Sequence, residues 1–213
     1  MPGNTLESFD AALSLGIDMI EFDVRAWRGR LVLAHTVLHA CGAQALVLEA
    51  ALAHLAGPRF DGVAVNVDVK HAGCEAVLLD GLRRHGLLNR ALLSSQVPEV
   101  IDRIRHREPR ARLGISVGGR LARLSRRWVD WRAHVLAGLA SERWHALMAQ
   151  HRLVDGELLE QVAARDGRLY AWTVNDRRSI AALRALGIHG VATADPRLFE
   201  PSGADAEPAA ATV

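Results

Sequence analysis

The hydrophobic positions along this chain fall into two alternating patterns. Short apolar or alternating runs of about four to eight residues are typical of β-strands, and longer runs with apolar residues every three or four positions are typical of helices. We expect strands within residues 18–25, 30–35, 63–70, 91–96, 111–117, 147–154, 168–174 and 190–196. Helical spacing covers residues 74–86, 97–108, 156–167 and 177–187, and each run ends near a glycine or in a basic last turn.

This alternation predicts an α/β protein in which parallel strands are joined by helical crossovers. About seven such units in ~200 residues favour a TIM-type (β/α)8 barrel over an open sheet. The barrel is expected over residues 1–200. Residues 201–213 carry no periodic apolar pattern and are expected to form a disordered tail.

Four polar residues stand at alternate positions of two strand runs, with apolar residues between them. Glu21 and Asp23 share one face of the first run, and Asp68 and Lys70 share one face of the third. A solvated sheet face would explain these acids, and so would a cation held between them. In a barrel the active site lies at the carboxyl ends of the strands, where these residues and His35 fall, which favours the second explanation.

The chemistry of this set points to a phosphate ester. Three carboxylates, Glu21, Asp23 and Asp68, are the hard oxygen ligands that suit Mg²⁺ or Ca²⁺. Lys70 would meet a phosphate oxygen, and His35 has the side chain whose ordinary pKa suits proton transfer near neutrality. Together they indicate metal-assisted cleavage of a phosphate ester, with His35 and Lys70 as the catalytic candidates.

Composition adds one sharper hint. Lys70 is the sole lysine of a chain whose other basic residues are all arginine, which indicates a need for a compact ammonium at that position. The formal net charge of +2 gives no reason to expect a nucleic-acid partner. No apolar run reaches the ~18 residues of a membrane span, and no signal sequence is evident, so we expect a cytoplasmic protein.

Four segments of the chain resemble the glycerophosphodiester phosphodiesterase family. "PGNTLESFDAALSLGIDMIEFDV" is similar to the family signature in which Asn-Thr begins a helix before a strand carrying Glu-x-Asp. "VNVDVK" is similar to its third-strand motif, and "AWTVND" and "LGIHGVATADP" resemble its last two strands. The resemblance runs in order from Pro2 to about Pro196. Within the first segment we expect Asn4 to be the N-cap of the helix.

The resemblance implies a phosphoric diester hydrolase of lipid metabolism. Its substrate is a small glycerophosphodiester, which is hydrolysed to glycerol 3-phosphate and an alcohol. A divalent metal ion, Mg²⁺ or Ca²⁺, is held by Glu21, Asp23 and Asp68. Lys70 contacts the phosphate and Trp172 borders the substrate, while two histidines, of which His35 is one, exchange protons.

The chain departs from the family pattern at its start. The family opens with a strand ending in His-Arg-Gly before the Asn-Thr, and this strand, with a catalytic histidine and a phosphate-binding arginine, is missing here. We therefore expect a barrel that lacks its first strand and a protein whose true start lies upstream. Two alternatives remain, a phosphate-binding barrel without catalysis and a related phospholipase D-like activity. Thr36, where the family has an Asp, weakens the expected support of His35.

The segment from Arg103 to Arg132 is rich in arginine and includes two tryptophans. It is either solvated surface or a patch for peripheral contact with anionic lipid headgroups. The sequence does not predict the oligomeric state.

Overall fold

The computed structural model describes residues 3–42, 45–119 and 125–199. The expected tail over residues 201–213 lies outside this part, as does the stretch 120–124 of the arginine-rich segment. The strands are β1 (Met19–Trp27), β2 (Arg30–Leu33), β3 (Ala64–Val69), β4 (Ala91–Ser95), β5 (Arg112–Val117), β6 (Ala146–Gln150), β7 (Arg168–Trp172) and β8 (Gly190–Val191).

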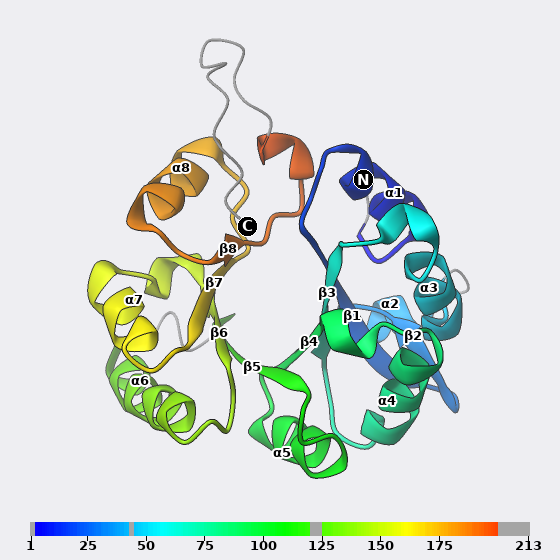
Figure 1. The fold of residues 1–213 in the computed structure, drawn as a ribbon, viewed down its shortest axis with the longest axis horizontal. Coiled ribbons are helices and arrows are strands. Elements are labelled where there is room, and N and C mark those ends of the chain that lie inside the picture. The colour runs from blue at the N-terminus through cyan, green and yellow to red at the C-terminus, as the bar shows by residue number, and fades with distance from the viewer. Residues whose placement is uncertain (1–2, 43–44, 120–124, 200–213) are drawn as a thin grey trace.

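The eight strands form one sheet in the order β2-β1-β3-β4-β5-β6-β7-β8. All neighbours from β1 through β3 to β8 pair in parallel, and the sheet curls into a ring (Figure 1). The fold is therefore the predicted α/β barrel type. One strand differs from the expected parallel pattern, because β2 pairs with β1 in the antiparallel direction. Only Arg28 and Gly29 separate these strands, both with positive φ, which is a hairpin turn and too short for a parallel crossover.

Helices surround the ring of strands (Figure 1). The four predicted helical runs are confirmed as α4, α5, α7 and α8, and the sequence pattern did not single out α2, α3 or α6. The helices are α1 (Leu6–Ser14), α2 (Val37–Ala40), α3 (Leu48–Leu55), α4 (Glu75–Arg84), α5 (Pro98–Arg107), α6 (Ser125–Ala140), α7 (Gly156–Ala163) and α8 (Arg177–Leu186). Short 3₁₀ turns are η1 (Pro58–Phe60), η2 (Leu88–Arg90), η4 (His151–Leu153) and η5 (Pro196–Phe199).

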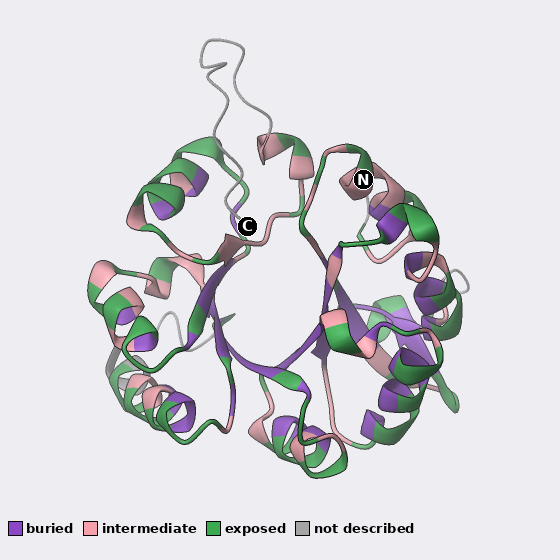
Figure 2. Cartoon of the chain, in the orientation of Figure 1, coloured by how far each residue is buried: buried purple, intermediate pink, exposed green. Residues whose placement is uncertain are grey.

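The main core lies between the strands and the helices (Figure 2). Strand residues such as Phe22, Val67 and Leu93 are fully buried there because both faces of each parallel strand are covered. A smaller cluster fills the inside of the ring and includes Met148 and Tyr170. Side chains thus fill part of the barrel interior and leave its two ends for polar groups.

The ring is open between β1 and β8, since neither strand pairs with the other in the described part of the chain. Parallel pairing with β3 uses alternate residues of β1, so Met19, Glu21 and Asp23 direct their backbone groups toward the opening. At Asp23, two other groups take the place of the missing strand neighbour. The Asp23 amide donates to Asn4 Oδ1 at 3.0 Å, and the Asp23 carbonyl accepts from the Ala34 amide at 3.0 Å.

The expected N-cap at Asn4 is wrong. Thr5 caps α1, accepting from the Ser8 amide in a reciprocal capping box. Asn4 instead has a φ of 62°, a left-handed conformation that asparagine tolerates, and this turns its side chain toward β1. The residue that the sequence assigned to helix capping is therefore a long-range support of Asp23.

Part of the arginine-rich segment is engaged in local contacts. Arg103 pairs with Glu99 one turn earlier on α5, and Arg105 donates to the carbonyl oxygens of Pro109 and Glu142. These contacts fit a structural surface. Among the described helices, none combines the length and the apolar character that a membrane span requires.

Replacing Gly138, inside α6, by alanine tests the packing of Trp144. A Cβ at Gly138 would lie 2.0 Å from Cζ2 of that fully buried ring, which is held by a hydrogen bond from its Nε1 to the Val135 carbonyl. At an open helix position this change gains about 1 kcal/mol, whereas overpacking costs about 1–3 kcal/mol. We expect a net loss of unfolding free energy, measured by urea denaturation. The matched control, Gly156→Ala at the start of α7, meets nothing closer than 3.7 Å and should be at least as stable as the parent. Greater stability at position 138 would contradict this account of the packing.

Candidate active site

The candidate site lies at the carboxyl end of the strands, in a cavity of about 660 Å³. All the predicted site residues line this cavity: Glu21, Asp23, His35, Asp68, Lys70 and Trp172. The cavity extends from the barrel mouth toward the opening between β1 and β8, where Phe9 of α1 and Phe199 of η5 also line it. Polar and charged groups therefore gather at one part of the cavity and apolar groups at another.

The register of β1 on β3 places Asp23 directly beside Asp68. Oxygen atoms of Glu21, Asp23 and Asp68 lie within 4.8 Å of one another, so the three predicted ligands converge. Asp68 Oδ1 is buried and has no hydrogen-bond partner in the described part of the chain. A buried carboxylate oxygen without a partner is costly, and a cation would satisfy it. The donor set therefore fits a hard divalent ion.

Lys70 contacts two of these three carboxylates and balances one negative charge. Its Nζ lies 2.5 Å from Asp23 Oδ1 and 2.6 Å from Asp68 Oδ2, and only 13% of the side chain is exposed. Burial alone would lower the pKa of Lys70, but the two carboxylates outweigh it and raise the pKa above its ordinary value. An ammonium has three donors, of which two are used here, so one remains for another acceptor.

The acids differ in how the site treats their charge. Burial would raise the pKa of Asp23, but Lys70 and the hydrogen bond from Asn4 Nδ2 hold it below its ordinary value. Burial raises the pKa of Asp68 in spite of Lys70. Desolvation by the surrounding protein raises the pKa of Glu21 to about 8, although the residue remains open to the cavity, and the neighbouring Asp23 and Asp68 carboxylates add to this rise. Negative charge is therefore in excess around Glu21.

His35 lies at the rim of the cavity, with 67% of its side chain exposed. Its Nδ1 is 3.3 Å from Asp23 Oδ2, so a carboxylate from β1 supports the ring. The sequence had placed that support in doubt because of Thr36. Thr36 has another function, since its hydroxyl accepts from the His39 amide and caps α2.

Trp172 forms a fixed wall of the cavity. Its Nε1 donates to the Met148 carbonyl at 2.9 Å, and its ring packs on Gly118, where a Cβ would lie 2.6 Å from Cη2. The indole is thus held both by a hydrogen bond and by a position that only glycine fits.

Sequence reasoning missed two residues of this site. Asn4 supports Asp23 through both ends of its amide group, a contact across 19 positions that no local pattern predicts. Asn66 lines the cavity two residues before Asp68, and its buried Oδ1 has no partner in the described part of the chain. The alternation that revealed Asp68 and Lys70 extends to Asn66 and could have identified it. Two other polar residues that end strand runs have structural roles, since Ser95 bonds the Val69 carbonyl and Asn175 accepts from Thr193.

Comparison with known proteins identifies one family. The sequence model of the glycerophosphoryl diester phosphodiesterase family matches residues 1–56 and 61–198. A curated relative, glycerophosphodiester phosphodiesterase GDPD4 from Arabidopsis thaliana, is 40% identical over 50 residues. That match covers 24% of this chain and only 15% of the plant protein.

Solved structures share the fold at low sequence identity. A protein from Silicibacter pomeroyi, described as a glycerophosphoryl diester phosphodiesterase, is 18% identical with a TM-score of 0.80, over 93% of this chain and 87% of that one. A glycerophosphodiester phosphodiesterase from Agrobacterium tumefaciens is 18% identical with a TM-score of 0.71, over 93% of this chain and 91% of that one. A phosphodiesterase from Oleispira antarctica was solved with the product sn-glycerol-3-phosphate. It is 19% identical with a TM-score of 0.68, over 90% of this chain and 87% of that one.

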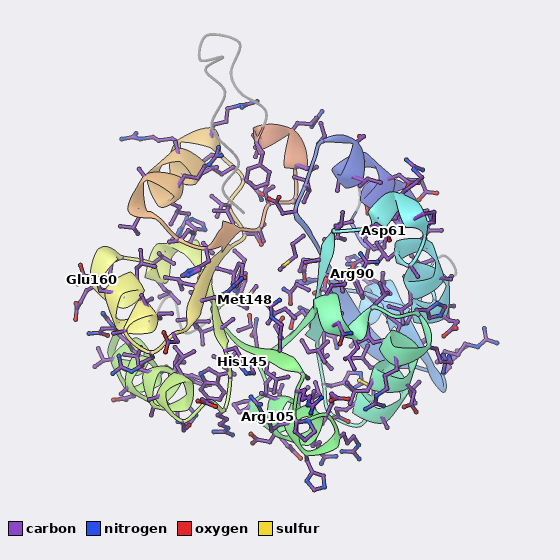
Figure 3. All side chains as sticks on the ribbon, in the orientation of Figure 1. Asp61, Arg90, Arg105, His145, Met148 and Glu160 are labelled. Carbon is purple, nitrogen blue, oxygen red and sulfur yellow. The ribbon has the colours of Figure 1, made fainter. Side chains whose placement is uncertain are left out.

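Titration with Mg²⁺ or Ca²⁺ tests the acidic cluster. A bound cation would relieve the excess negative charge, so we expect either ion to raise the melting midpoint. At a hundredfold excess over Kd the gain corresponds to about 2.7 kcal/mol. Asp68→Asn should abolish the gain because it removes the unpartnered carboxylate. Asp61→Asn, on the outside of the barrel (Figure 3), is the control and should behave as the parent. An equal gain in Asp68→Asn and parent would place the ion elsewhere.

Proposed function

Because the chain belongs to the glycerophosphoryl diester phosphodiesterase family, we propose that it hydrolyses small glycerophosphodiesters to glycerol 3-phosphate and an alcohol. The observation that carries this proposal is the convergence of Glu21, Asp23, Asp68 and Lys70 in one cavity. The Oleispira antarctica relative was solved with sn-glycerol-3-phosphate as its product, which supports the same product here.

Glu21, Asp23 and Asp68 would hold a divalent metal ion, Mg²⁺ or Ca²⁺. When bound, the ion would neutralise charge on the phosphate oxygens of the substrate. The position of the metal ion would be set by Asp23 and Asp68, because hydrogen bonds from Asn4 and Lys70 hold these two carboxylates in place. Glu21, which has no such partner among the described residues, is the ligand free to adjust.

Lys70 would bind the phosphate directly. Two of its protons are directed at Asp23 and Asp68, and the third is available to a non-bridging oxygen of the diester. This arrangement holds the ammonium in position before substrate arrives, so no side-chain freedom is lost on binding.

His35 would move one proton in the reaction. Hydrolysis adds a water oxygen to phosphorus and breaks the phosphorus–oxygen bond to the alcohol; the water loses a proton and the leaving oxygen gains one. With Nδ1 on Asp23, His35 Nε2 is free to give or take one of these protons. Trp172 would lie beside the substrate, next to the phosphodiester group that is cleaved.

A second candidate function is phosphate binding without turnover. Among the residues that the structure describes, His35 is the one histidine lining the cavity, whereas the reaction needs two proton transfers. A phospholipase D-like activity would use the same acidic cluster on a larger substrate. Product analysis separates the three proposals, since only the first releases glycerol 3-phosphate from a deacylated diester.

The deciding experiment is hydrolysis of glycerophosphocholine by the purified chain. We expect release of glycerol 3-phosphate with Mg²⁺ or Ca²⁺ and none after exhaustive chelation, with recovery when the ion is returned. Glu21→Gln and Asp23→Asn should lose activity together with cation binding, whereas Asp61→Asn should keep both. Full turnover after chelation would remove the ion from the reaction. Binding of phosphate without any product would favour the second candidate.

Lys70 offers a sharper test of charge against geometry. Lys70→Met keeps the length of the side chain and removes its charge, and we expect at least a ~10²-fold loss of kcat/KM. Lys70→Arg should not restore activity, because the planar guanidinium is wider than the ammonium that fits between Asp23 and Asp68. Steady-state kinetics of both variants beside the parent measure this. Parent-like turnover in Lys70→Arg would mean that charge alone suffices.

A further inference from the structure

A second cavity, of about 260 Å³, lies at the opposite end of the barrel, where the strands begin. The first residues of three neighbouring strands line it: Arg112 of β5, Ala146 of β6 and Arg168 of β7. His145, which precedes β6, also lines it, and in Figure 3 it lies beside the β5 ribbon, with Arg105 of α5 further out. None of these residues belongs to the candidate active site.

Two solvent-exposed arginines, Arg112 and Arg168, line this cavity without an acidic partner among the described residues. Neither Arg112 nor Arg168 forms an ion pair or a hydrogen bond with another side chain or carbonyl in the part of the chain that the structure describes. By contrast, Arg103 and Arg143 on the outer surface are each paired with a carboxylate. The two guanidiniums thus bring ten N–H donors to one place with their hydrogen-bonding capacity unused.

His145 adds a donor in a fixed orientation. Its Nδ1 accepts the Leu113 amide at 3.0 Å, so the proton of the neutral ring is on Nε2. Burial lowers the pKa of His145, and the charges of Arg105 and Arg112 lower it further, against smaller opposing effects of the hydrogen bond with the Leu113 backbone and of Glu142. The ring is therefore neutral at neutral pH and offers an N–H group.

Tyr170 adds the fourth donor. The residue is only 9% exposed, and its hydroxyl has no hydrogen-bond partner among the described groups. It lines this cavity and not the larger one. The hydroxyl oxygen itself is not fully enclosed, so it can donate to a ligand in the cavity.

Asp166 is the one acidic residue among those that line this cavity. With His145 neutral, two guanidiniums against one carboxylate leave a net charge of +1 around the cavity. The cavity therefore has more hydrogen-bond donors than acceptors, and more positive than negative charge.

We propose that this cavity is a binding site for a phosphate-class oxyanion, either free phosphate or the phosphate group of a monoester. Arg112 and Arg168 would bind it from neighbouring strands, because the planar guanidinium fork matches two oxygens of a phosphate at once. Tyr170 and His145 would donate to the remaining oxygens. A planar carboxylate has too few oxygens for donors that come from four directions. The inference is independent of the proposed function, since it shares no residue with that site.

The test is an NMR titration of the intact chain with its histidine rings isotope-labelled, using inorganic phosphate and, separately, glycerol 3-phosphate. A bound anion favours the imidazolium, so we expect saturable movement of the His145 signals and an upward shift of its pKa. His54, outside the barrel between Asp10 and Phe60, is the internal reference and should not move. A response to phosphate alone would limit the site to the free ion, and a response to both would show that it accepts monoesters.

Variants assign the response to this cavity. Arg112→Gln and Arg168→Gln should each weaken the affinity reported by His145 by about tenfold or more, and Tyr170→Phe by several-fold. Arg110→Gln, an exposed arginine two residues before Arg112, is the matched control and should bind as the parent. Arg112→Lys covers the case in which the glutamine variant does not fold, and it should retain part of the affinity. No movement of His145 at tens of millimolar phosphate, or equal affinity in Arg168→Gln and parent, would overturn the proposal.

Discussion

The charge balance between two adjacent strands is the constraint on which the site depends. Parallel pairing sets Asp23 of β1 beside Asp68 of β3, and both side chains are buried. Like charges at that separation destabilise the fold unless a cation lies between them. Lys70 meets this requirement with two short contacts, but Glu21 adds a third carboxylate that forms no ion pair among the described residues, and its pKa rises to about 8. Three carboxylates thus share one ammonium, and a bound metal ion would balance this excess of acidic groups.

The open side of β1 explains why Asn4 matters to this balance. A strand inside a closed barrel has its backbone groups bonded on both sides, and β1 has only β3 along its first half. At Asp23 the Asn4 side chain and the Ala34 amide occupy the hydrogen-bonding positions that a neighbouring strand would supply. The same amide group of Asn4 then donates to the Asp23 carboxylate. The Asn4 side chain therefore fixes both the backbone and the carboxylate of Asp23, a predicted metal ligand at the edge of the sheet. Helix α1, which follows Asn4, forms one wall of the cavity.

The sequence was sufficient for the elements whose signal is local. Alternation in residues 63–70 predicted a buried strand with Asp68 and Lys70 on one face, and helical spacing predicted α4, α5, α7 and α8 within a few residues. The strand within residues 30–35 was predicted and is β2, but its antiparallel direction was not, because its apolar residues resemble those of a parallel strand, although the Arg28-Gly29 turn was visible. Asn4 was assigned to the wrong task because Thr5 next to it caps equally well, and only the folded chain shows which residue reaches β1. Arg112 and Arg168 could not be singled out, since unpaired arginines differ from paired ones only in three dimensions.

The two ends of the barrel present opposite electrostatic problems. Each crossover helix begins at the carboxyl end of a strand and ends where the next strand starts, so helix N-termini gather near the carboxylate cluster and helix C-termini near Arg112 and Arg168. The partial positive charge of the N-termini favours a phosphate at the first end. At the second end the helix C-termini disfavour an anion, and the basic last turns of α4 and α5 offset part of that field. An oxyanion at this end therefore needs guanidinium groups that are not already paired with helix C-termini. Arg112 and Arg168 can supply them, because they begin strands β5 and β7 and do not belong to the last turns of the helices.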